Sequence, residues 1–503
     1  MDLLLDLDAA PGTTLRRRAE HALREAVRCG RLAPGTRLPS TRALALQLGV
    51  SRGVVVEAYA QLAAEGYLRT RRGGGTTVAE GGGAGVVGGG AAAGAGTTDA
   101  LGGSDWSGAV VGAGRTAPAP MRHDLRPALP ALSGFPRGAW LAAVSRVLRA
   151  APDERLGYAD PAGVPELRET LAAYLGRVRG VRAAPQQIVV TSGLRQGLGL
   201  LWAALAERGR DDRRDGATDG RRADGRGNGA TDGDRRAMRV AFERPGWRGW
   251  TQTAEAAGWE TVPLAVDDDG ADVDAIEQLG VDAVGITPAH QFPTGAVLSA
   301  ARRGSLVAWA QRRGAVVVED DYDAEFRYDR KPIGSLQGLA PDVVVYGGSA
   351  SKTLAPAVRI GWLVLPTPLV AAVVATQRRL GGMPAPLDQL ALADLIERGE
   401  LDRHLRRQRR RYRRQRDALL QALARELPDV AVEGAAAGLH AVLRLPPQLD
   451  ERAVLAAARA RGVALDGLGH GAPALVVGYA NVTEPAVAPA VAALVAAIRA
   501  AAS

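Results

Sequence analysis

A tract rich in glycine and alanine divides this chain into two parts. Residues 81–104 are almost all Gly, Ala, Val, Ser and Thr, and they include the run GGGAGVVGGGAAAGAG. Such a segment cannot bury enough apolar surface to offset the conformational entropy that folding costs. We therefore expect a flexible linker over residues 80–120, a first domain over residues 1–79 and a second domain over residues 121–503.

A second low-complexity tract lies inside the longer domain. Residues 208–236 carry charges of both signs, few apolar side chains and two copies of GATDG. Two copies are too few for a repeat architecture. We expect residues 208–236 to be a disordered insertion at the surface of this domain.

The first domain has the pattern of a helix-turn-helix followed by a hairpin. LRRRAEHALREAVRCG has apolar side chains at helical spacing from Leu15 to Val27. TRALALQLG and SRGVVVEAYAQLAAEG follow as two helices, which Ser40 or Thr41 and then Ser51 can cap. YLRTRRGGGTTVAE, with glycines at its tip, predicts a small two-stranded wing. The second helix of such a pair can enter the major groove of DNA.

This first domain is also strongly basic. Residues 11–80 hold 12 arginines and 5 glutamates, a net charge of +7, and the whole chain carries +9. Arginine neutralises phosphates and reads guanine edges, so double-stranded DNA is a fitting partner. The alternative is a three-helix packing module with a solvated charged face. The arginines on or beside the expected DNA-reading surface are Arg42, Arg52, Arg69, Arg71 and Arg72.

The second domain alternates helical patterns with short apolar runs. Because helices separate several of these runs, we expect a mainly parallel β-sheet in an α/β domain. Ligands bind such sheets at the carboxyl ends of the strands, so the polar residues that end the runs are candidates for a site. The runs are RVAFERP (239–245), DAVGITP (282–288), AVVVEDDY (315–322), DVVVYGG (342–348) and IGWLVLP (360–366).

Any chemistry that needs a lysine amine has two candidates, because the chain contains only Lys331 and Lys352. Lys352 follows one apolar run and precedes Arg359, and AVVVEDDYD places acids directly after another run. A lysine beside a phosphate site and a buried acid suits pyridoxal 5′-phosphate (PLP): the lysine binds its aldehyde, the acid its pyridine nitrogen, and Ser and Arg its phosphate. The alternative is a lysine at the edge of the sheet that pairs with Asp320 or Asp321 and holds no cofactor.

Several other classes of protein fit the composition poorly. The single cysteine, Cys29, excludes a disulfide framework and a cysteine-based metal cluster, and the six histidines show no ligand spacing, so we expect no metal site. MDLLLDLDAAPG carries acids where a signal peptide has a positive region. No 18-residue apolar stretch is free of Pro and Gly breaks, so we expect a cytoplasmic protein without a membrane span.

Three segments of residues 14–79 stand in a characteristic order: GRLAPGTRLPSTRALALQLGVSR, then AYAQLAAEGYL, then RRGGGT. They resemble the winged-helix domain of GntR-type regulators. The resemblance implies that Arg42 and the start of the third helix contact DNA, beside the arginines of the wing. Gly53-Val54 replaces the polar pair that is usual in that family. The implied DNA-binding residues are Arg42, Ser51, Arg52, Gly53, Arg71 and Arg72.

Six motifs follow one another over residues 121–500. They are GYADPAGVPELR (157–168), TSGLRQGL (191–198), ERPGWRG (243–249), TPAHQFPTG (287–295), EDDYDAEFRY (319–328) and SASKTLAPAVRIGW (349–362). In this order they resemble fold-type I PLP-dependent aminotransferases, and more narrowly the MocR/GabR-like regulators, including PdxR-like ones, which fuse this fold to a GntR-type winged helix. The resemblance implies a PLP-dependent transferase fold with a mainly parallel sheet and a small C-terminal α/β subdomain.

The resemblance also implies which side chains surround the PLP ring. Lys352 would form the internal aldimine, and Asp320 would hold the pyridine nitrogen. Tyr322 would bond the 3′ oxygen, and Trp247 would stack on the ring face unless it is an ordinary core or rim aromatic. His290, with the neighbouring Gln291, would line the pocket, although a purely structural turn is the alternative there.

The phosphate of PLP would be bound at the other end of the pocket. Ser349 and Arg359 would hold it, helped by the backbone amides of Ser192, Gly193 and Leu194. Tyr158 would reach the phosphate of the neighbouring subunit in a homodimer.

Two departures from the aminotransferase pattern bear on function. Phe292 stands before PTG where ordinary aminotransferases carry Asn, which favours the regulators over working transaminases. The predicted strand ALVVGYAN (474–481) has no arginine for a substrate carboxylate, and Gly249 stands where the GABA-sensing regulator has a second arginine. A regulator that senses PLP itself and governs vitamin B6 synthesis fits better.

These observations predict a PLP-responsive transcription factor that acts on vitamin B6 or on amino-acid and amine metabolism. An amine or amino acid is a possible further effector. The rival interpretation is an aminotransferase with a DNA-binding appendage, and a third is a binding module with an empty pocket. RHLRRQRRRYRRQR (403–416) holds nine arginines and no acid. It is either the solvated face of a long helix or an auxiliary contact to DNA.

Overall fold

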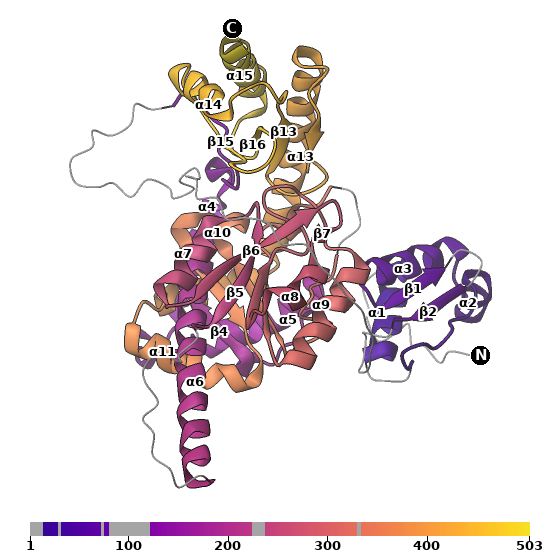
Figure 1. Ribbon diagram of the computed structural model, residues 1–503, viewed down its shortest axis with the longest axis vertical. Helices are drawn as coiled ribbons and strands as arrows, with labels where there is room; N and C mark the ends of the chain where they lie inside the picture. Colours follow the sequence, from indigo (N-terminus) through magenta and orange to yellow (C-terminus); the bar gives the residue numbers. More distant parts are fainter. Residues whose placement is uncertain are drawn as a thin grey trace.

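The computed structural model shows a small helical module beside a large α/β domain, with a second, smaller α/β unit at the C-terminal end (Figure 1). The N-terminal module lies on the side of the large domain that carries α9 (Figure 1). The structure describes residues 14–28, 32–71, 75–79, 121–223, 237–328 and 333–502.

The first domain is a winged helix-turn-helix, as predicted. Ser40 accepts a hydrogen bond from the Ala43 amide and Ser51 one from the Val54 amide, so serine side chains cap the second and third helices. Gly49 ends the second helix in a left-handed conformation. The elements are α1 (Leu15–Arg28), α2 (Thr41–Leu48) and α3 (Arg52–Ala64), followed by the antiparallel pair β1 (Leu68–Arg71) and β2 (Gly75–Val78).

All five predicted apolar runs are strands of one eight-stranded sheet. Its order is β4-β11-β10-β9-β8-β5-β6-β7. Strands β10, β9, β8, β5 and β6 are parallel, whereas β4, β11 and β7 pair antiparallel with their neighbours. The bounds are β4 (Ile188–Thr191), β5 (Arg239–Arg244), β6 (Glu260–Asp267), β7 (Gly270–Ala271), β8 (Ala283–Ile286), β9 (Val316–Asp320), β10 (Val344–Ser349) and β11 (Gly361–Val364).

Helices cover both faces of this sheet, and successive residues of β9 point to opposite faces. Val318 packs in the cluster formed with α6 (Leu194–Ala223), α7 (Arg248–Ala256) and α11 (Thr367–Leu380). Val317 packs on the other face, with α8 (Ile276–Leu279) and α9 (Ala300–Arg313). Further along that second face lie α5 (Pro165–Arg179) and α12 (Pro386–Glu397), which in turn contacts α4 (Arg137–Ala150).

The C-terminal subdomain is a four-stranded sheet with helices packed on it. The strand order is β12-β13-β16-β15, and the predicted strand ALVVGYAN corresponds to β16. The strand β3 (His123–Asp124) pairs with β14 (Val463–Ala464) and so ties the start of the second domain to this subdomain. The remaining bounds are β12 (Val432–Glu433), β13 (His440–Arg444), β15 (Asp466–Gly467), β16 (Ala474–Gly478), α10 (Ala350–Thr353), α13 (Glu400–Glu426), α14 (Glu451–Ala460) and α15 (Glu484–Ala502).

The structure corrects the predicted extent of the disordered insertion. Helix α6 continues to Ala223, so residues 208–223 are helical rather than disordered. A helix that starts against the buried sheet is already nucleated, and each further residue adds one backbone hydrogen bond at little cost. Residues 224–236 lie outside the described residues, as do the linker segment 80–120 and Lys331.

One helix, α15, is long and apolar enough to cross a membrane by length and composition alone. It contains Pro489 and packs against α13 and α14. Its inward face is part of the core of the C-terminal subdomain, as in an ordinary core helix. The buried side chains on this face are Val487, Ala490, Val491, Leu494, Val495, Ala497 and Ile498.

Candidate functional site

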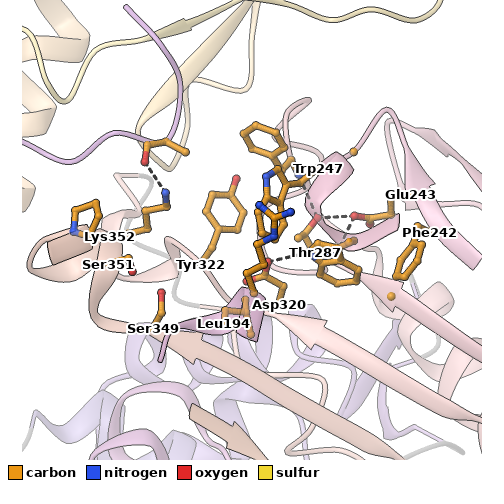
Figure 2. A pocket seen from close by; sticks show the side chains of 18 of the residues that line it. Leu194, Phe242, Glu243, Trp247, Thr287, Asp320, Tyr322, Ser349, Ser351 and Lys352 are labelled. Atoms are coloured by element: carbon orange, nitrogen blue, oxygen red, sulfur yellow. Dashed lines mark hydrogen bonds between the residues drawn. The ribbon is translucent and has the colours of Figure 1, made fainter. Parts of the chain in front are cut away.

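A cavity of about 310 Å³ lies at the carboxyl ends of β5, β8, β9 and β10, beside the N-terminus of α6. Figure 2 shows side chains from these elements converging on it. This is the edge of the sheet where parallel strands place ligands. The cavity is lined by Ala128, Gly193, Leu194, Arg195, Phe242, Glu243, Gly246, Trp247, Trp250, Gly285, Thr287, Phe292, Asp320, Tyr322, Ser349, Ser351, Lys352, Pro356 and Arg359.

Three consecutive acids at the end of β9 have three different surroundings. Side chains alternate along a strand, so Glu319 and Asp321 lie on one side of the sheet and Asp320 on the other. Glu319 accepts the amides of Leu336 and Gln337 at 2.9 and 2.8 Å. Asp321 forms a buried pair with Arg179. Asp320 is left to line the cavity.

Asp320 has one hydrogen-bond donor and one open position. The indole Nε1 of Trp250 donates to its Oδ2 at 3.3 Å, and Oδ1 is buried without a partner among the described residues. Burial raises the pKa of this carboxyl to about 8. A carboxylate in such a position favours a cationic N–H donor placed in the cavity. Gly285 makes room for Trp250, because a Cβ on residue 285 would collide with the indole ring.

Lys352 projects into the same cavity from α10. Its Nζ donates to the carbonyl oxygen of Ala128 at 2.7 Å, and burial lowers the pKa of this amine (Figure 2). A lowered pKa leaves more of the amine neutral and nucleophilic. Within the described part of the chain, Lys352 forms no ion pair with Asp320 or Asp321, contrary to the alternative considered above. Arg179 occupies Asp321 instead.

Four of the predicted phosphate-binding residues line the cavity: Gly193, Leu194, Ser349 and Arg359. Gly193 and Leu194 stand at the start of α6, where free backbone amides and the helix dipole favour an anion. The guanidinium of Arg359 lies beside them, 3.7 Å from the position that a Cβ on residue 193 would take. Ser349 and Ser351 complete this lining. A Cβ on Gly361 would lie 2.8 Å from Gly193, so the close approach of these two segments requires glycine.

Tyr322 belongs to a buried polar cluster behind the cavity. Its hydroxyl lies 3.0 Å from Nδ1 of His290, and that nitrogen is 3.1 Å from both oxygens of Asp323. Phe292 packs edge-on against Tyr322 and against His440. Burial lowers the pKa of His440 to about 4, so this imidazole is neutral at physiological pH. The cluster fixes the position of the tyrosine hydroxyl.

The structure places most, but not all, of the predicted cofactor residues at the cavity. His290 is buried one layer behind it, in contact with Tyr322. Ser192 lies beside the cavity, where its hydroxyl bonds the carbonyl of Gly382, and Tyr158 is fully exposed. Predicted residues that line the cavity are Lys352, Asp320, Tyr322, Trp247, Ser349, Arg359, Gly193 and Leu194.

Some residues of the site were missed from the sequence. Trp250 donates a hydrogen bond to Asp320, but the motif pointed to Trp247, three positions earlier. Glu243 accepts hydrogen bonds from the amide and hydroxyl of Thr287, at 3.0 and 2.5 Å, and burial raises its pKa to about 7. The backbone oxygen of Ala128 carries no sequence signal. A strand-end acid such as Glu243 could have been found by the rule that polar residues ending the apolar runs approach the site.

The residues of the cavity fit PLP. Asp320 offers an unsatisfied buried oxygen to a pyridinium N–H, Lys352 offers a poised amine, and Arg359 with the α6 terminus offers an anion site. Trp247 lines the cavity as the candidate stacking ring. A Cβ on Gly249 would collide with this indole, so Trp247 in this position excludes an arginine at residue 249.

The predicted DNA-reading residues lie at the open end of the winged helix. Arg42 and the first residues of α3, Ser51, Arg52 and Gly53, are exposed. Arg69 is exposed on β1. Arg71 ends β1, and Arg72 lies outside the described residues.

The arginine-rich segment 403–416 lies on α13 and is largely engaged within the domain. Arg409 and Arg413 donate to the carbonyl oxygens of Glu325 and Tyr328 at 2.8 and 3.0 Å. Arg416 stacks over the Tyr328 ring at 4.6 Å. These contacts support a structural role for much of the segment. Arg406, Arg407 and Arg410 are exposed.

Comparison with known proteins agrees with this architecture. The model of bacterial regulatory proteins of the gntR family matches residues 15–78, and the model of class I and II aminotransferases matches residues 132–211 and 235–494. The HTH-type pyridoxine biosynthesis transcriptional regulator PdxR of Corynebacterium glutamicum is 32% identical over 93% of this chain and 91% of its own length. The probable rhizopine catabolism regulatory protein MocR of Rhizobium meliloti is 31% identical over 95% and 92%.

Solved structures that resemble the second domain are aminotransferases. The α-aminoadipate aminotransferase LysN of Thermus thermophilus, complexed with N-(5′-phosphopyridoxyl)-L-leucine, superposes with a TM-score of 0.64 at 25% identity, over 75% of this chain and 92% of its own. The multiple substrate aminotransferase of Thermococcus profundus gives a TM-score of 0.65 at 23% identity, over 75% and 91%.

A winged helix joined to a fold-type I aminotransferase domain defines a class of DNA-binding transcriptional regulators. The chain belongs to this class. It is a member of the GntR family of bacterial regulatory proteins, in the MocR/PdxR-like group that carries a class I and II aminotransferase domain.

Replacing Asp320 by asparagine will test the open position at this carboxyl. The PLP-free wild-type protein binds a proton at Asp320 up to its folded pKa of about 8, whereas the unfolded chain releases it near the ordinary value of about 3.9. Stability from this group is therefore present at low pH and is lost as the pH rises toward 8. Because Asp320→Asn does not titrate, its stability advantage over the PLP-free wild type should grow from about pH 4 to pH 8 and then level off.

With PLP bound, the wild type should be more stable than Asp320→Asn, because asparagine cannot supply the negative charge that would hold a pyridinium N–H. A charge-assisted hydrogen bond contributes about 1.5–3 kcal/mol, so we expect roughly 10- to 150-fold weaker PLP binding. Thermal unfolding from pH 4 to 9, with and without PLP, measures both effects. Parallel pH profiles of the two proteins would contradict the assignment.

Proposed function

We propose that this protein is a transcription factor whose second domain binds PLP and whose affinity for its DNA site changes when PLP binds. The observation that carries the proposal is that two groups line the same cavity: Asp320 Oδ1, which is buried without a partner among the described residues, and the amine of Lys352. The winged helix supports the DNA-binding half, because a catalyst has no use for it.

Several lining residues would contact the cofactor. When bound, PLP supplies an aldehyde carbon and an electron-withdrawing ring. Lys352 would be the covalent attachment point, and its hydrogen bond to the carbonyl oxygen of Ala128 orients the amine. Asp320 would hold a proton on the pyridine nitrogen, and the hydrogen bond from Trp250 positions its carboxylate. Tyr322, positioned by His290, is available to the 3′ oxygen.

Other lining residues would bind the phosphate and the ring face. Ser349 and Arg359, with the amides at Gly193 and Leu194, would hold the phosphate. Trp247 would cover one face of the ring.

The regulated pathway is proposed from two features. The resemblance implies two arginines that bind a carboxylate effector, one at the position of Gly249 and one in strand β16, and this chain has neither. The relative from Corynebacterium glutamicum is named for pyridoxine biosynthesis. We infer that PLP itself is the signal and that the controlled genes belong to vitamin B6 metabolism, with an amine or amino-acid effector as the alternative.

Titration of the protein onto its own upstream DNA, with and without PLP at fixed salt, tests this proposal. A PLP-dependent change in affinity or footprint is the expected result. Tight DNA binding with the same affinity in both conditions would indicate an effector other than PLP. The absence of specific binding would overturn the regulator proposal.

A homodimer in the cytoplasm is part of the proposal. Tyr158 is fully exposed, and several large apolar side chains are more than half exposed. Exposed apolar side chains of this size mark contact surfaces when they gather. If these groups are buried against a second copy of the chain, Tyr158 gains contacts in that copy. Sedimentation equilibrium measures the mass of the assembly and therefore tests for the dimer. The apolar side chains are Leu132, Leu141, Leu148 and Leu156.

The second candidate function is an aminotransferase with a DNA-binding appendage. The observation that favours it is the complete set formed by Lys352, Asp320, Tyr322 and Arg359. A relative named 2-aminoadipate transaminase, from Thermus thermophilus, is 26% identical over 67% of this chain. Incubation with amino acids and a keto acid acceptor separates the two functions, because only an enzyme sustains turnover.

Arg52→Ala will weaken DNA binding and reduce its salt dependence. Arg52 is exposed at the first position of α3, and a phosphate contact there displaces counterions. We expect about tenfold weaker binding and a salt slope smaller by about 1. The matched control is Arg379→Ala, on α11, which removes an arginine paired with Glu207 at 2.5 Å. Equal affinities and slopes for both variants would contradict the role of Arg52.

A further inference from the structure

The winged helix rests on the second domain through the turn that joins α3 to β1. This docking corner, residues 65–67, faces a docking loop formed by residues 333–339. The hydroxyl of Tyr67 donates to the carbonyl oxygen of Gly338 at 3.3 Å. A Cβ on Gly66 would lie 3.7 Å from Cδ1 of Leu339, and a Cβ on Gly334 3.3 Å from the Glu65 carboxyl carbon. Both Glu65 and Tyr67 are buried.

Hydrogen bonds and a glycine turn fix the conformation of the docking corner. Arg24 donates to the Glu65 carboxylate at 2.7 Å, and Gln61 donates to the other carboxylate oxygen at 2.6 Å. Gly66 has a φ of +83°, which favours glycine at this turn. Leu339 packs against the apolar core of the winged helix and also against the core of the second domain. The contact therefore joins two cores rather than two loose surfaces.

The docking loop is held by the strand that carries Asp320. Glu319 accepts the amides of Leu336 and Gln337, at 2.9 and 2.8 Å. Arg179, paired with Asp321, donates to the carbonyl oxygen of Ile333 at 2.6 Å. The two chain neighbours of Asp320 thus fix the loop from one side of the sheet, Glu319 directly and Asp321 through Arg179, while Asp320 lines the cavity on the other side.

The opposite end of α3 is left open by this contact. Ser51, Arg52 and Gly53 are exposed at the N-terminus of the helix, whereas docking uses the turn after Ala64. Docking therefore orients the DNA-reading end without covering it. In a protein with two such modules, their orientation decides which spacing of half-sites they can contact together.

We propose that the docking loop, residues 333–339, is the surface through which the cavity sets the position of the winged helix, with Glu319 as the positioning residue between them. The segment that occupies this surface is the docking corner, residues 65–67 of the same sequence. This inference rests on the proposed function, because PLP is the ligand expected to act on Asp320. PLP shifts the docking equilibrium to the extent that it binds the docked and undocked states differently.

Hydrogen exchange of the full-length protein, with and without PLP, tests the proposal. Tyr67→Phe removes the hydroxyl that crosses between the domains. Tyr59→Phe is the matched control, because its hydroxyl donates to the carbonyl of Pro39 inside the winged helix at 2.9 Å. We expect Tyr67→Phe to speed exchange over residues 335–340 about fivefold, the effect of one lost hydrogen bond, and Tyr59→Phe to leave these residues unchanged.

A second variant, Leu339→Asp, places a charge between the two cores. Exchange should then rise over residues 65–68, while the amides of α3 from Val55 to Leu62 stay protected. Unchanged exchange over residues 65–68 in Leu339→Asp, or equal effects of the two tyrosine variants, would overturn the docking surface.

PLP retention, read from absorbance, is measured on the same samples. A wild-type protein that does not retain PLP would refute the proposed function. A wild type that retains PLP but shows the same exchange over residues 335–340 with and without it would refute the coupling alone. Glu319→Gln should retain PLP and lose the PLP-dependent change, and a preserved change would remove Glu319 from its positioning role.

Discussion

Lys352→Ala will abolish covalent retention of PLP and, with it, every PLP-dependent change in DNA binding. Among the described residues, Lys352 is the one lysine that lines the cavity, and its Nζ donates a hydrogen bond to the carbonyl oxygen of Ala128 at 2.7 Å. Burial lowers the pKa of this amine, so it is poised as a nucleophile. Alanine removes the amine but leaves the winged helix untouched, so basal DNA binding should persist.

The chain offers a matched control in its other lysine, Lys331. Reduction with borohydride, followed by peptide mapping, locates any covalently bound cofactor. We expect label on the peptide of Lys352 in the wild type and in Lys331→Ala, and none in Lys352→Ala. Label on Lys331 would show that the attachment point is wrong.

Arg179→Met will destabilise the second domain by about 3–5 kcal/mol, the usual effect of leaving one charge of a buried pair alone. The side chains of Arg179 and Asp321 are 3% and 2% exposed, and two hydrogen bonds of 2.5 and 3.1 Å join them. Tyr346 donates to the same carboxylate at 2.7 Å. One hydroxyl cannot replace a guanidinium, so Asp321 would stay buried and largely uncompensated.

Arg414→Met is the control for the loss of an arginine as such. Arg414 and Glu484 pair at 3.2 Å, but their side chains are 61% and 54% exposed. Exposed pairs contribute about 0–1 kcal/mol. Urea unfolding followed by tryptophan fluorescence compares the two variants. A loss below 1 kcal/mol in Arg179→Met would show that the buried pair is not needed for stability.

Features set by neighbouring residues could be predicted from the sequence. Ser40 and Ser51 cap the helices they precede, and the five apolar runs form strands, because caps and apolar runs depend on a few adjacent residues. The motif around Lys352 likewise placed Arg359 in the lining of the cavity.

Features set by distant residues could not be predicted in the same way. Three acids follow one another at the end of β9, and the residues alone did not say which of them would face the cavity. The choice is made by Arg179, which lies 142 positions away and takes Asp321. Trp250 and the carbonyl of Ala128 also reach the site through tertiary packing. The length of α6 was missed because its polar end extends a helix begun in the core.

The alternation of acids along β9 has a consequence for how this family can vary in length. An insertion or deletion of one residue within the strand would exchange its two faces. Glu319 or Asp321 would then face the cavity, and Asp320 would face Arg179 and the loop of residues 333–339. Length changes among related chains should therefore be absent between Val316 and Asp320.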